Sequence, residues 1–315
     1  MSAAAPRPIE GRLDGVITAA FGRHYEVDVS RSVGEAGNGV TPRLKCYPRG
    51  KKSIFACGDE VEVTQTGRDQ GVIDRLHPRR NLLWRSDAFR EKLIAANLTQ
   101  VVIVVATEPG FSDMLISRCI AAAESQQIKT LIVLNKSDLQ ALLPAARKML
   151  APFERLGYPV LELSARDGAD ALRPKLAGEH SILVGQSGMG KSTLTNALIP
   201  AARAATREIS EALNSGKHTT TFARLYPIDR GWLIDSPGLQ AFGLAHLGAD
   251  ELAESFIEFH DHLGKCRFRD CLHESEPGCA LRTAIGAGAI DPCRFEHYRQ
   301  IRDEIAIAKR QSQGW

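Results

Sequence analysis

The segment Gly185-Gln186-Ser187-Gly188-Met189-Gly190-Lys191-Ser192-Thr193 matches the pattern G-x-x-x-x-G-K-[ST] of phosphate-binding loops. An apolar run at residues 181–184 precedes it, and a helix-like stretch at residues 193–199 follows it. Its glycines allow a tight turn whose backbone N–H groups face phosphate oxygens. A chance glycine-rich turn lacks this strand-loop-helix context. The segment therefore predicts that the chain binds a nucleoside triphosphate.

Two side chains of this loop have specific expected roles. The Lys191 ammonium is placed to reach the β- and γ-phosphates of the nucleotide. The Ser192 hydroxyl is expected to bind the Mg²⁺ that accompanies them.

The composition sets bounds on the class of protein. The 315 residues suffice for two or three domains, with 43% hydrophobic and 24% charged residues, as in globular proteins. No apolar run approaches the ~20 residues that span a bilayer, and the N-terminus lacks an apolar signal core, so we predict neither membrane insertion nor secretion. Seven cysteines, an odd number, argue against a disulfide framework. A net charge of +3 does not by itself indicate nucleic acid.

Residues 11–77 alternate polar and apolar positions in five or six short segments broken by glycines. This spacing predicts a small β-barrel, for which we favour the OB type. The predicted strands are residues 15–20, 24–29, 43–47, 53–56, 60–64 and 71–74. Basic residues surround Tyr47 at Arg43, Lys45, Arg49, Lys51 and Lys52. They are suited to bind a phosphate backbone while the ring stacks on a base, although a solvated turn with ordinary lysines explains them equally well.

Beyond residue 95 apolar strands alternate with helical patterns, which predicts an α/β domain with a parallel sheet buried on both faces. The predicted strands are 100–106, 130–135, 159–163, 181–184, 222–228 and 231–235, and the predicted helices are 114–125, 139–156 and 169–176. Basic residues around Trp84, at Arg79, Arg80, Arg85, Arg90 and Lys92, precede this region and suggest a connection between domains. From Ala249 the chain is predicted to be helical.

The segment Asn135-Lys136-Ser137-Asp138 follows an apolar strand and predicts guanine specificity. The Asp138 carboxylate can accept from the guanine N1–H and N2–H₂ pair, an edge that adenine lacks. We expect Asn135 to contact the other polar edge of the base, with the Lys136 stem covering the nucleoside. Ser164 and Ala165, after the next strand, are expected to offer backbone N–H groups to guanine O6.

The segment Asp235-Ser236-Pro237-Gly238 also ends a strand and has the D-x-x-G arrangement. Its carboxylate is expected to hold Mg²⁺ through water, and the Gly238 N–H to meet the γ-phosphate. Residues 217–221, between the phosphate loop and Asp235, lie where a nucleotide-sensing switch belongs. In ordinary GTPases the phosphate loop precedes the base motif, whereas here residues 135–138 and Ser164 come first. The motif set is therefore complete but rotated in sequence.

A cluster of three cysteines and one histidine marks the C-terminal region. Three thiolates and one imidazole suit a closed tetrahedral Zn²⁺ site, which would be structural because no coordination position stays open. The expected ligands are Cys266, Cys271, His273 and Cys279. Buried free cysteines are the alternative, but the charged neighbours of the cluster argue against an apolar core. We expect Cys293, His260 and His262 to be structural residues.

The C-terminal helices also carry basic residues, at Arg282, Arg294, Arg299, Arg302, Lys309 and Arg310. Alone they would indicate a solvated face. Next to a zinc module and a basic barrel, they predict contact with RNA.

These motifs together resemble the circularly permuted GTPases of the RsgA family, which are ribosome small-subunit-dependent. The resemblance covers almost the whole chain and is carried by the permuted order, the cysteine spacing and the text Gly216-Lys217-His218-Thr219-Thr220-Thr221. It implies a tail at 1–10, an OB-fold RNA-binding domain at 11–82, the GTPase domain at 83–245 and a helical zinc-binding domain at 246–315. The tail has no basic cluster, so a basic N-terminal extension for RNA is not expected.

The same resemblance implies a cytoplasmic, late-stage maturation factor of the small (30S) ribosomal subunit. It would bind GTP and GDP, contact ribosomal RNA and act as a monomer. The subunit would stimulate GTP hydrolysis, and hydrolysis would release the factor. Thr220 would join Ser192 on Mg²⁺ when the γ-phosphate is present. A β-branched strand start is the simpler explanation for residues 219–221.

Hydrolysis needs a group that orients the attacking water. Leu239 stands where a Ras-like protein has glutamine, and leucine has no donor or acceptor, so slow intrinsic turnover is expected. His218 is the best candidate for this role, although it is also suited to be an exposed switch residue. A nucleotide-gated RNA-binding module in which hydrolysis is incidental remains the alternative function. A P-loop ATPase or kinase is disfavoured by Asp138.

Overall fold

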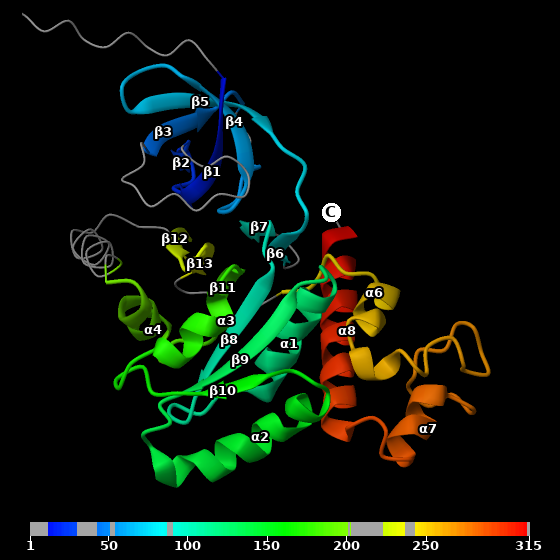
Figure 1. Cartoon of the computed structure of the whole chain (residues 1–315). Helices are drawn as coiled ribbons and strands as arrows, with labels where there is room; N and C mark the ends of the chain where they lie inside the picture. The colour runs from blue at the N-terminus through cyan, green and yellow to red at the C-terminus, as the bar shows by residue number, and fades with distance from the viewer. Residues whose placement is uncertain are drawn as a thin grey trace, which may run out of the picture.

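The computed structural model describes residues 12–29, 43–50, 54–86, 91–200, 202, 223–236 and 243–313. Within these residues the chain forms an N-terminal barrel, a central sheet flanked by helices, and a C-terminal helical unit (Figure 1). The barrel encloses a small core of its own. The sheet and the C-terminal helices share one continuous larger core. The C-terminal unit is therefore packed onto the sheet rather than tethered to it.

The barrel is formed by five strands, and their order is that of an OB fold. Strand β1 pairs with both β2 and β4, and β3 pairs with β5 in parallel, so the ring closes in the order 1-2-3-5-4. The strands are β1 (Arg12–Ala20), β2 (Tyr25–Asp28), β3 (Arg43–Pro48), β4 (Glu60–Gln65) and β5 (Gln70–Leu76). Alternation along β3 buries Leu44 and Cys46 and exposes Lys45 and Tyr47.

A strand predicted at residues 53–56 is not formed by the part that the structure describes. Residues 54–56 are irregular because the backbone N–H of Ala56 donates to the Asp59 carboxylate at 2.7 Å, which stabilises a turn instead of a ladder. The fully buried Asp59 also accepts two hydrogen bonds from Arg79, each 2.7 Å long. Arg79, predicted to belong to a basic connection, thus forms a structural ion pair with Asp59.

A two-stranded hairpin connects the barrel to the central sheet. Its strands are β6 (Leu82–Ser86) and β7 (Glu91–Ala96). The Ala96 N–H donates to the Cys57 carbonyl at 2.9 Å, so the hairpin is tied to the barrel by backbone hydrogen bonding. The connection predicted around Trp84 is therefore a small folded element rather than a simple linker.

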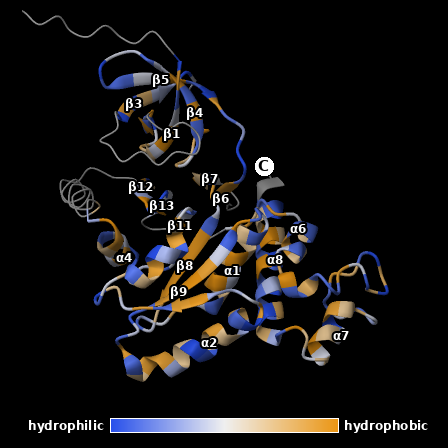
Figure 2. Cartoon of the chain, in the orientation of Figure 1, coloured by the Kyte–Doolittle hydropathy of each residue, from blue (hydrophilic) through white to orange (hydrophobic). Residues whose placement is uncertain are grey.

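The central sheet has the order β10-β9-β8-β11-β13-β12. Its strands are β8 (Gln100–Ala106), β9 (Lys129–Asn135), β10 (Val160–Glu162), β11 (His180–Val184), β12 (Arg224–Ile228) and β13 (Gly231–Asp235). The five strands from β10 to β13 are parallel, and Figure 2 shows how apolar β8 and β9 are. Strand β12 is antiparallel because only Asp229 and Arg230 connect it to β13.

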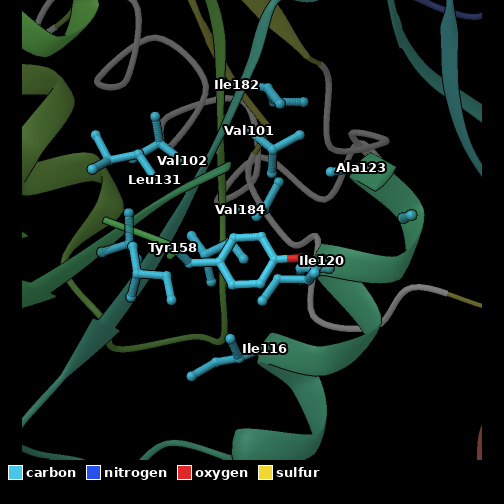
Figure 3. Close-up of a cluster of buried hydrophobic side chains, with 14 of the residues drawn as sticks. Val101, Val102, Ile116, Ile120, Ala123, Leu131, Tyr158, Ile182 and Val184 are labelled. Carbon is cyan, nitrogen blue, oxygen red and sulfur yellow. The ribbon is translucent and has the colours of Figure 1, made fainter. Parts of the chain in front are cut away.

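Helices cover the sheet and bury its faces. They are α1 (Asp113–Glu124), α2 (Leu143–Arg155), α3 (Arg173–Leu176) and α4 (Lys191–Leu198), with short 3-10 turns η1 (Gln140–Leu142) and η2 (Asp170–Leu172). Figure 3 shows Ile116 and Ile120 of α1 facing side chains of the sheet such as Val101 and Leu131, with Tyr158 between them. The Tyr158 hydroxyl donates to Glu124 at 3.0 Å, which satisfies the polar end of a largely buried ring.

The C-terminal unit consists of α6 (Ala249–Glu254), η3 (Ile257–Phe259), α7 (Ala280–Gly286) and α8 (Pro292–Gln313). Figure 1 shows α8 running beside α1. An aromatic cluster of Phe256, Phe259, Phe295 and Tyr298 joins η3 to α8, with ring centroids 5.1–6.2 Å apart. None of the described helices is long and apolar enough to cross a membrane.

Most of the basic residues predicted to form one side of the C-terminal helices bond to other groups of the protein. Arg294 is 1% exposed, bonds Glu258 at 2.8 Å and lies over the Phe256 ring. Arg302 pairs with Asp303 and Glu274. The Lys309 ammonium donates to the Leu247 carbonyl at 2.7 Å. Because α8 is packed between other elements, most of its cations must find partners within the protein.

Candidate nucleotide site and metal centre

The predicted nucleotide motifs follow strands whose carboxyl ends meet at one edge of the sheet. The register pairs Ala106 with Asn135 and Leu183 with Asp235, so β8, β9, β11 and β13 end side by side. The strand order places the motifs in space as Ser164, Asn135, the phosphate loop and Asp235. Ligands of open α/β sheets bind in crevices at this edge. The edge is therefore the candidate site.

Backbone geometry explains two glycines of the phosphate loop. Gly190 has φ +91° and is the N-cap of α4, and a Cβ built on it would lie 2.2 Å from the Asn135 amide nitrogen. Gly185 has φ +142°, and its Cβ would lie 2.2 Å from the Val104 carbonyl oxygen. Any larger residue at these positions must displace the neighbouring strands.

The loop presents unpaired backbone donors. Among the described residues, the backbone N–H groups from Gln186 to Thr193 have no protein acceptor. Ser192 and Thr193, in the first turn of α4, are exposed. Free amides at the N-terminus of a helix form an anion-binding cradle. The loop is therefore built to receive phosphate oxygens.

Lys191 lies at the centre of this loop. Its ammonium is buried and donates to the carbonyls of Gly185 at 2.6 Å and Gln186 at 2.7 Å. Burial lowers the pKa of Lys191, and the nearby charge of Asp235 acts in the opposite direction. The side chain is thus held under the loop, with its charge beside the expected phosphate position.

Asp235 has a carboxylate oxygen that lacks a partner. The residue is 8% exposed, and its Oδ1 atom makes no hydrogen bond. Burial raises the pKa of Asp235, while a hydrogen bond from Thr195 and the charge of Lys191 lower it. An orphaned buried carboxylate beside a phosphate loop fits the outer coordination sphere of Mg²⁺, so these residues suit the expected metal.

The Asn135 side chain bridges three motifs of the site. Its side-chain amide donates to the Met189 carbonyl at 2.9 Å, and its Oδ1 accepts from the Ala165 N–H at 2.9 Å. The Ala165 N–H is thus engaged within the protein, while one hydrogen of the Asn135 amide is left for the base, and the predicted contacts of both residues with guanine stay predictions. Asn135 is 1% exposed, and burial demands that both ends of its amide be bonded.

The rest of the base motif leaves ligand-binding atoms available. The Ser137 N–H donates to the Leu163 carbonyl at 3.1 Å, which fixes the turn carrying Asp138. Asp138 is exposed, and no described residue donates to its carboxylate. The Lys136 ammonium donates to the Glu108 carbonyl at 2.6 Å. The buried Ser164 hydroxyl has no partner, as expected of a group that meets a ligand.

The candidate nucleotide site has a further part, the loop of residues 107–112, which no motif in the sequence indicates. The Thr107 hydroxyl donates to the Lys136 carbonyl at 3.0 Å, and the Ser112 N–H donates to the Gln186 side chain at 3.3 Å. This loop therefore braces both the base motif and the phosphate loop. In the sequence, the feature that marks this loop is the Pro109-Gly110 turn after the apolar strand β8. That turn matches no nucleotide motif.

Part of the predicted site lies outside the described residues. This applies to His218, Thr220, Gly238 and Leu239. Their predicted roles stay predictions.

The cysteine cluster brings its four predicted ligands together. The ligand atoms of Cys266, Cys271, His273 and Cys279 lie within 4.8 Å of one another. His273 Nδ1 lies 3.5, 3.5 and 3.4 Å from the three sulfur atoms. One ring nitrogen cannot form three hydrogen bonds at once, whereas the sulfur–nitrogen edge of a tetrahedral zinc site is about 3.5 Å. The donor set and its geometry therefore fit zinc.

Backbone donors support this centre. The Ala280 N–H donates to the Cys266 sulfur at 3.3 Å. The Glu276 carboxylate accepts backbone hydrogen bonds from residues 272, 274 and 275. Hydrogen bonds from its own N–H and from these three lower the pKa of Glu276 to about 2. Such outer contacts orient ligands before the metal arrives.

Fold and site together define a class of protein, a P-loop GTPase in which the base motif precedes the phosphate loop. Solved structures support that class. YjeQ from Thermotoga maritima is similar at TM-score 0.71 and 29% identity, over 94% of this chain and 99% of that chain. YloQ, described as a circularly permuted GTPase, is similar in fold at TM-score 0.69 and 24% identity, over 96% and 98% of the two chains.

The chain belongs to the RsgA GTPase family, whose model matches residues 76–245. A relative from Burkholderia pseudomallei (strain 668) is 54% identical over 94% of this chain and 93% of its own length. A relative from Bordetella pertussis is 52% identical over 94% and 97%. Both are named small ribosomal subunit biogenesis GTPase RsgA. The predicted family, permuted fold and GTP-hydrolysing activity are confirmed.

Replacing Gly190 with alanine is expected to weaken GTP binding roughly tenfold or more, because left-handed strain of about 1–2 kcal/mol adds to the clash with Asn135. Titration with a fluorescent, non-hydrolysable GTP analogue measures the effect. Gly178→Ala is the matched control, since Gly178 has φ +76° with nothing within 4 Å of a new Cβ. Equal affinities for the two variants would show that the contact with Asn135 does not matter.

Proposed function

We propose that this chain is a maturation factor of the small ribosomal subunit. The subunit stimulates GTP hydrolysis by the factor, and hydrolysis releases the factor from the subunit. The relatives' names point to this subunit. The observation that carries the proposal is an aromatic and basic surface on the barrel of a GTPase, in which Lys45 and Tyr47 are exposed and two further rings are half-buried. We call it the barrel surface and define it by Phe21, His24, Lys45 and Tyr47.

The contacts of the barrel surface suit single-stranded RNA. Tyr47 is 43% exposed, and the Lys45 ammonium lies 5.7 Å from its ring centroid. His24 stacks on Phe21 at 4.8 Å and lies 6.1 Å from Tyr47. These residues come from β3 and the β1–β2 loop, where OB folds bind oligonucleotides. Exposed rings provide stacking platforms, and the neighbouring cation attracts phosphate.

The other basic residues of the barrel contribute less. Arg49 pairs with Asp74 at 2.5 Å, and Arg43 lies 3.9 Å from Glu26. Lys51 and Lys52 lie outside the described residues. The C-terminal helices add few free cations, as shown above. The barrel surface is therefore the favoured contact with ribosomal RNA.

For nucleotide recognition, the free Asp138 carboxylate is assigned to the guanine N1–H and N2–H₂ groups. The loop amides from Gln186 to Thr193 and the Lys191 ammonium are assigned to the phosphates. Asn135, Lys136 and Ser137 position this apparatus, and Ser164 lies in the base pocket. The support for these roles is the unpaired state of the Asp138 carboxylate, the loop amides and the Ser164 hydroxyl.

Asp138→Asn should weaken GTP binding by about tenfold to a hundredfold, because a charged hydrogen bond is worth about 1.5–3 kcal/mol. The same variant should gain affinity for xanthosine nucleotides, whose 2-oxo group can accept from the new amide. Competitive titration with both nucleotides measures the exchange. Unchanged GTP affinity would refute the assignment of Asp138 to the base.

For hydrolysis, Ser192 and Thr220 are assigned to Mg²⁺, and Asp235 holds its water. The cation supplies charge neutralisation at the β- and γ-phosphates. The Gly238 N–H is assigned to the γ-phosphate. His218 is proposed to orient the attacking water once the subunit closes the switch, since its neutral ring can accept a hydrogen bond. Because His218 lies outside the described residues, the sequence alone supports its role.

Purified small subunits should raise the rate constant of GTP hydrolysis, measured under single-turnover conditions. Lys45→Ala combined with Tyr47→Ala should increase the subunit concentration for half-maximal stimulation by roughly tenfold, because stacking is worth about 1–3 kcal/mol per base. Lys148→Ala with Met149→Ala, an exposed basic and apolar pair on α2, is the matched control.

Two outcomes of this assay would change the proposal. Absence of stimulation by the subunit would leave the GTP-gated RNA-binding module as the function. Full stimulated turnover by a His218→Ala variant, with GTP binding unchanged, would remove the catalytic role of His218.

The tetrahedral cluster is proposed to hold one structural Zn²⁺ that stabilises residues 264–290. Removing the metal with a chelator should release the zinc held by these four residues and reduce helical circular dichroism, while leaving GTP affinity largely unchanged. Cys271→Ala should bind no zinc there. Cys46→Ala, at a buried barrel thiol, is the control and should retain it. Loss of GTP binding on zinc removal would show that the centre supports the GTPase core as well.

The proposal also covers the localisation, the oligomeric state and the domain bounds of the protein. The protein is proposed to work in the cytoplasm as a monomer. The bounds 11–82, 83–245 and 246–315 are proposed for its domains. The barrel, with its own core, supports the first boundary. Because the sheet and the C-terminal helices share one core, we expect the zinc-loaded protein to unfold them in one transition, with zinc loss loosening residues 264–290 alone, which differential scanning calorimetry would test.

A further inference from the structure

A second cluster of metal-ligating side chains lies between α1 and α8. Cys293 and His297 are one helical turn apart on α8, and they face Asp113 in the first turn of α1. The ligand atoms of these three residues lie within 4.8 Å of one another. No nucleotide motif and no part of the zinc cluster uses them.

The sulfur–nitrogen distance matches an edge of a coordination polyhedron, and Asp113 presents one carboxylate oxygen to each of the other two ligands. The Cys293 sulfur lies 3.5 Å from His297 Nε2 and 3.5 Å from Asp113 Oδ2. His297 Nε2 lies 3.6 Å from Asp113 Oδ1. Tetrahedral zinc with sulfur, nitrogen and oxygen ligands has edges of about 3.4–3.6 Å. The contact between His297 and Asp113 is long for a hydrogen bond between nitrogen and oxygen, and the three groups leave room for a shared cation.

A second layer of contacts orients the histidine. His297 is 6% exposed, and its Nδ1 bonds the hydroxyl of Ser117 at 2.8 Å. Ser117 is fully buried in α1, so the ring cannot rotate freely. Metal-binding histidines typically engage their second nitrogen in this way, which aims the first at the ion.

One side of the cluster is open to solvent. Cys293 is exposed, whereas His297 is buried and Asp113 is half-buried. Three protein ligands and one open position are the arrangement in which water or an external ligand completes the coordination. This distinguishes the cluster from the closed four-ligand centre at residues 266–279.

We propose that Asp113, Cys293 and His297 form a second metal site, which binds a zinc-like divalent transition-metal ion with an open fourth position. The mixed sulfur, nitrogen and oxygen donors select borderline cations over Mg²⁺ or Ca²⁺. Bound there, the ion cross-links α1 to α8. Asp113 directly follows Ser112, whose N–H bonds Gln186 of the phosphate loop, so the link ends beside the nucleotide site.

The test is a Co²⁺ titration of the full-length protein whose structural centre already holds zinc. Wild type should bind one further equivalent and develop a thiolate-to-cobalt charge-transfer band, with no zinc released. Cys293→Ser should abolish the band, because the thiolate is its source. Ser117→Ala should lower the Co²⁺ affinity about 10–100-fold by freeing the ring. His260→Asn, at an exposed histidine outside the cluster, should bind as wild type does.

Circular dichroism of each variant, compared with wild type, establishes that it is folded. Because Cys293 is exposed, its replacement should not disturb the core. The proposal is overturned if zinc-loaded wild type shows no band, if the band persists in Cys293→Ser, or if its growth is matched by zinc release. The last result would mean that cobalt had only exchanged into residues 266–279.

Discussion

The nucleotide site depends on one buried side chain, the amide of Asn135. Its two hydrogen bonds join the base motif to the Met189 carbonyl of the phosphate loop and to the Ala165 N–H of the next loop. A buried amide must satisfy both ends, so the three loops hold one another in a single arrangement. The same contact leaves no room for a side chain at position 190. Base and phosphate recognition are therefore coupled before any ligand binds.

The permuted order leaves this arrangement intact, because the carboxyl ends of parallel strands share one edge in whatever sequence the chain visits them. What permutation alters is the neighbourhood of the site. Strand β12 pairs with β1 of the barrel at Arg224 and Ala19, and Arg224 bonds Glu26 at 3.1 Å. On the other side α8 packs along α1 (Figure 1). Both flanking units thus contact the GTPase sheet or its helices.

Burial, and not the number of basic residues in the sequence, decides which cations are available at the surface. Arginines that look available in the sequence, such as Arg79 and Arg294, neutralise buried carboxylates. On the barrel, Lys45 at an outward position of β3 stays near the exposed ring of Tyr47. Because each buried charge needs a partner, packing decides which cations remain for RNA.

The sequence by itself determined the family, the permuted α/β fold, the barrel and the residues that gather at the nucleotide edge and the zinc cluster. These depend on local patterns: strand alternation, a glycine-rich loop and ligand spacing. Only the tertiary structure decided that Asn135 joins the base motif to the phosphate loop, that residues 107–112 brace the loops, and that Asp113 meets Cys293 and His297. Those contacts join residues 29–184 positions apart, and no local pattern encodes which distant side chains will share a buried space.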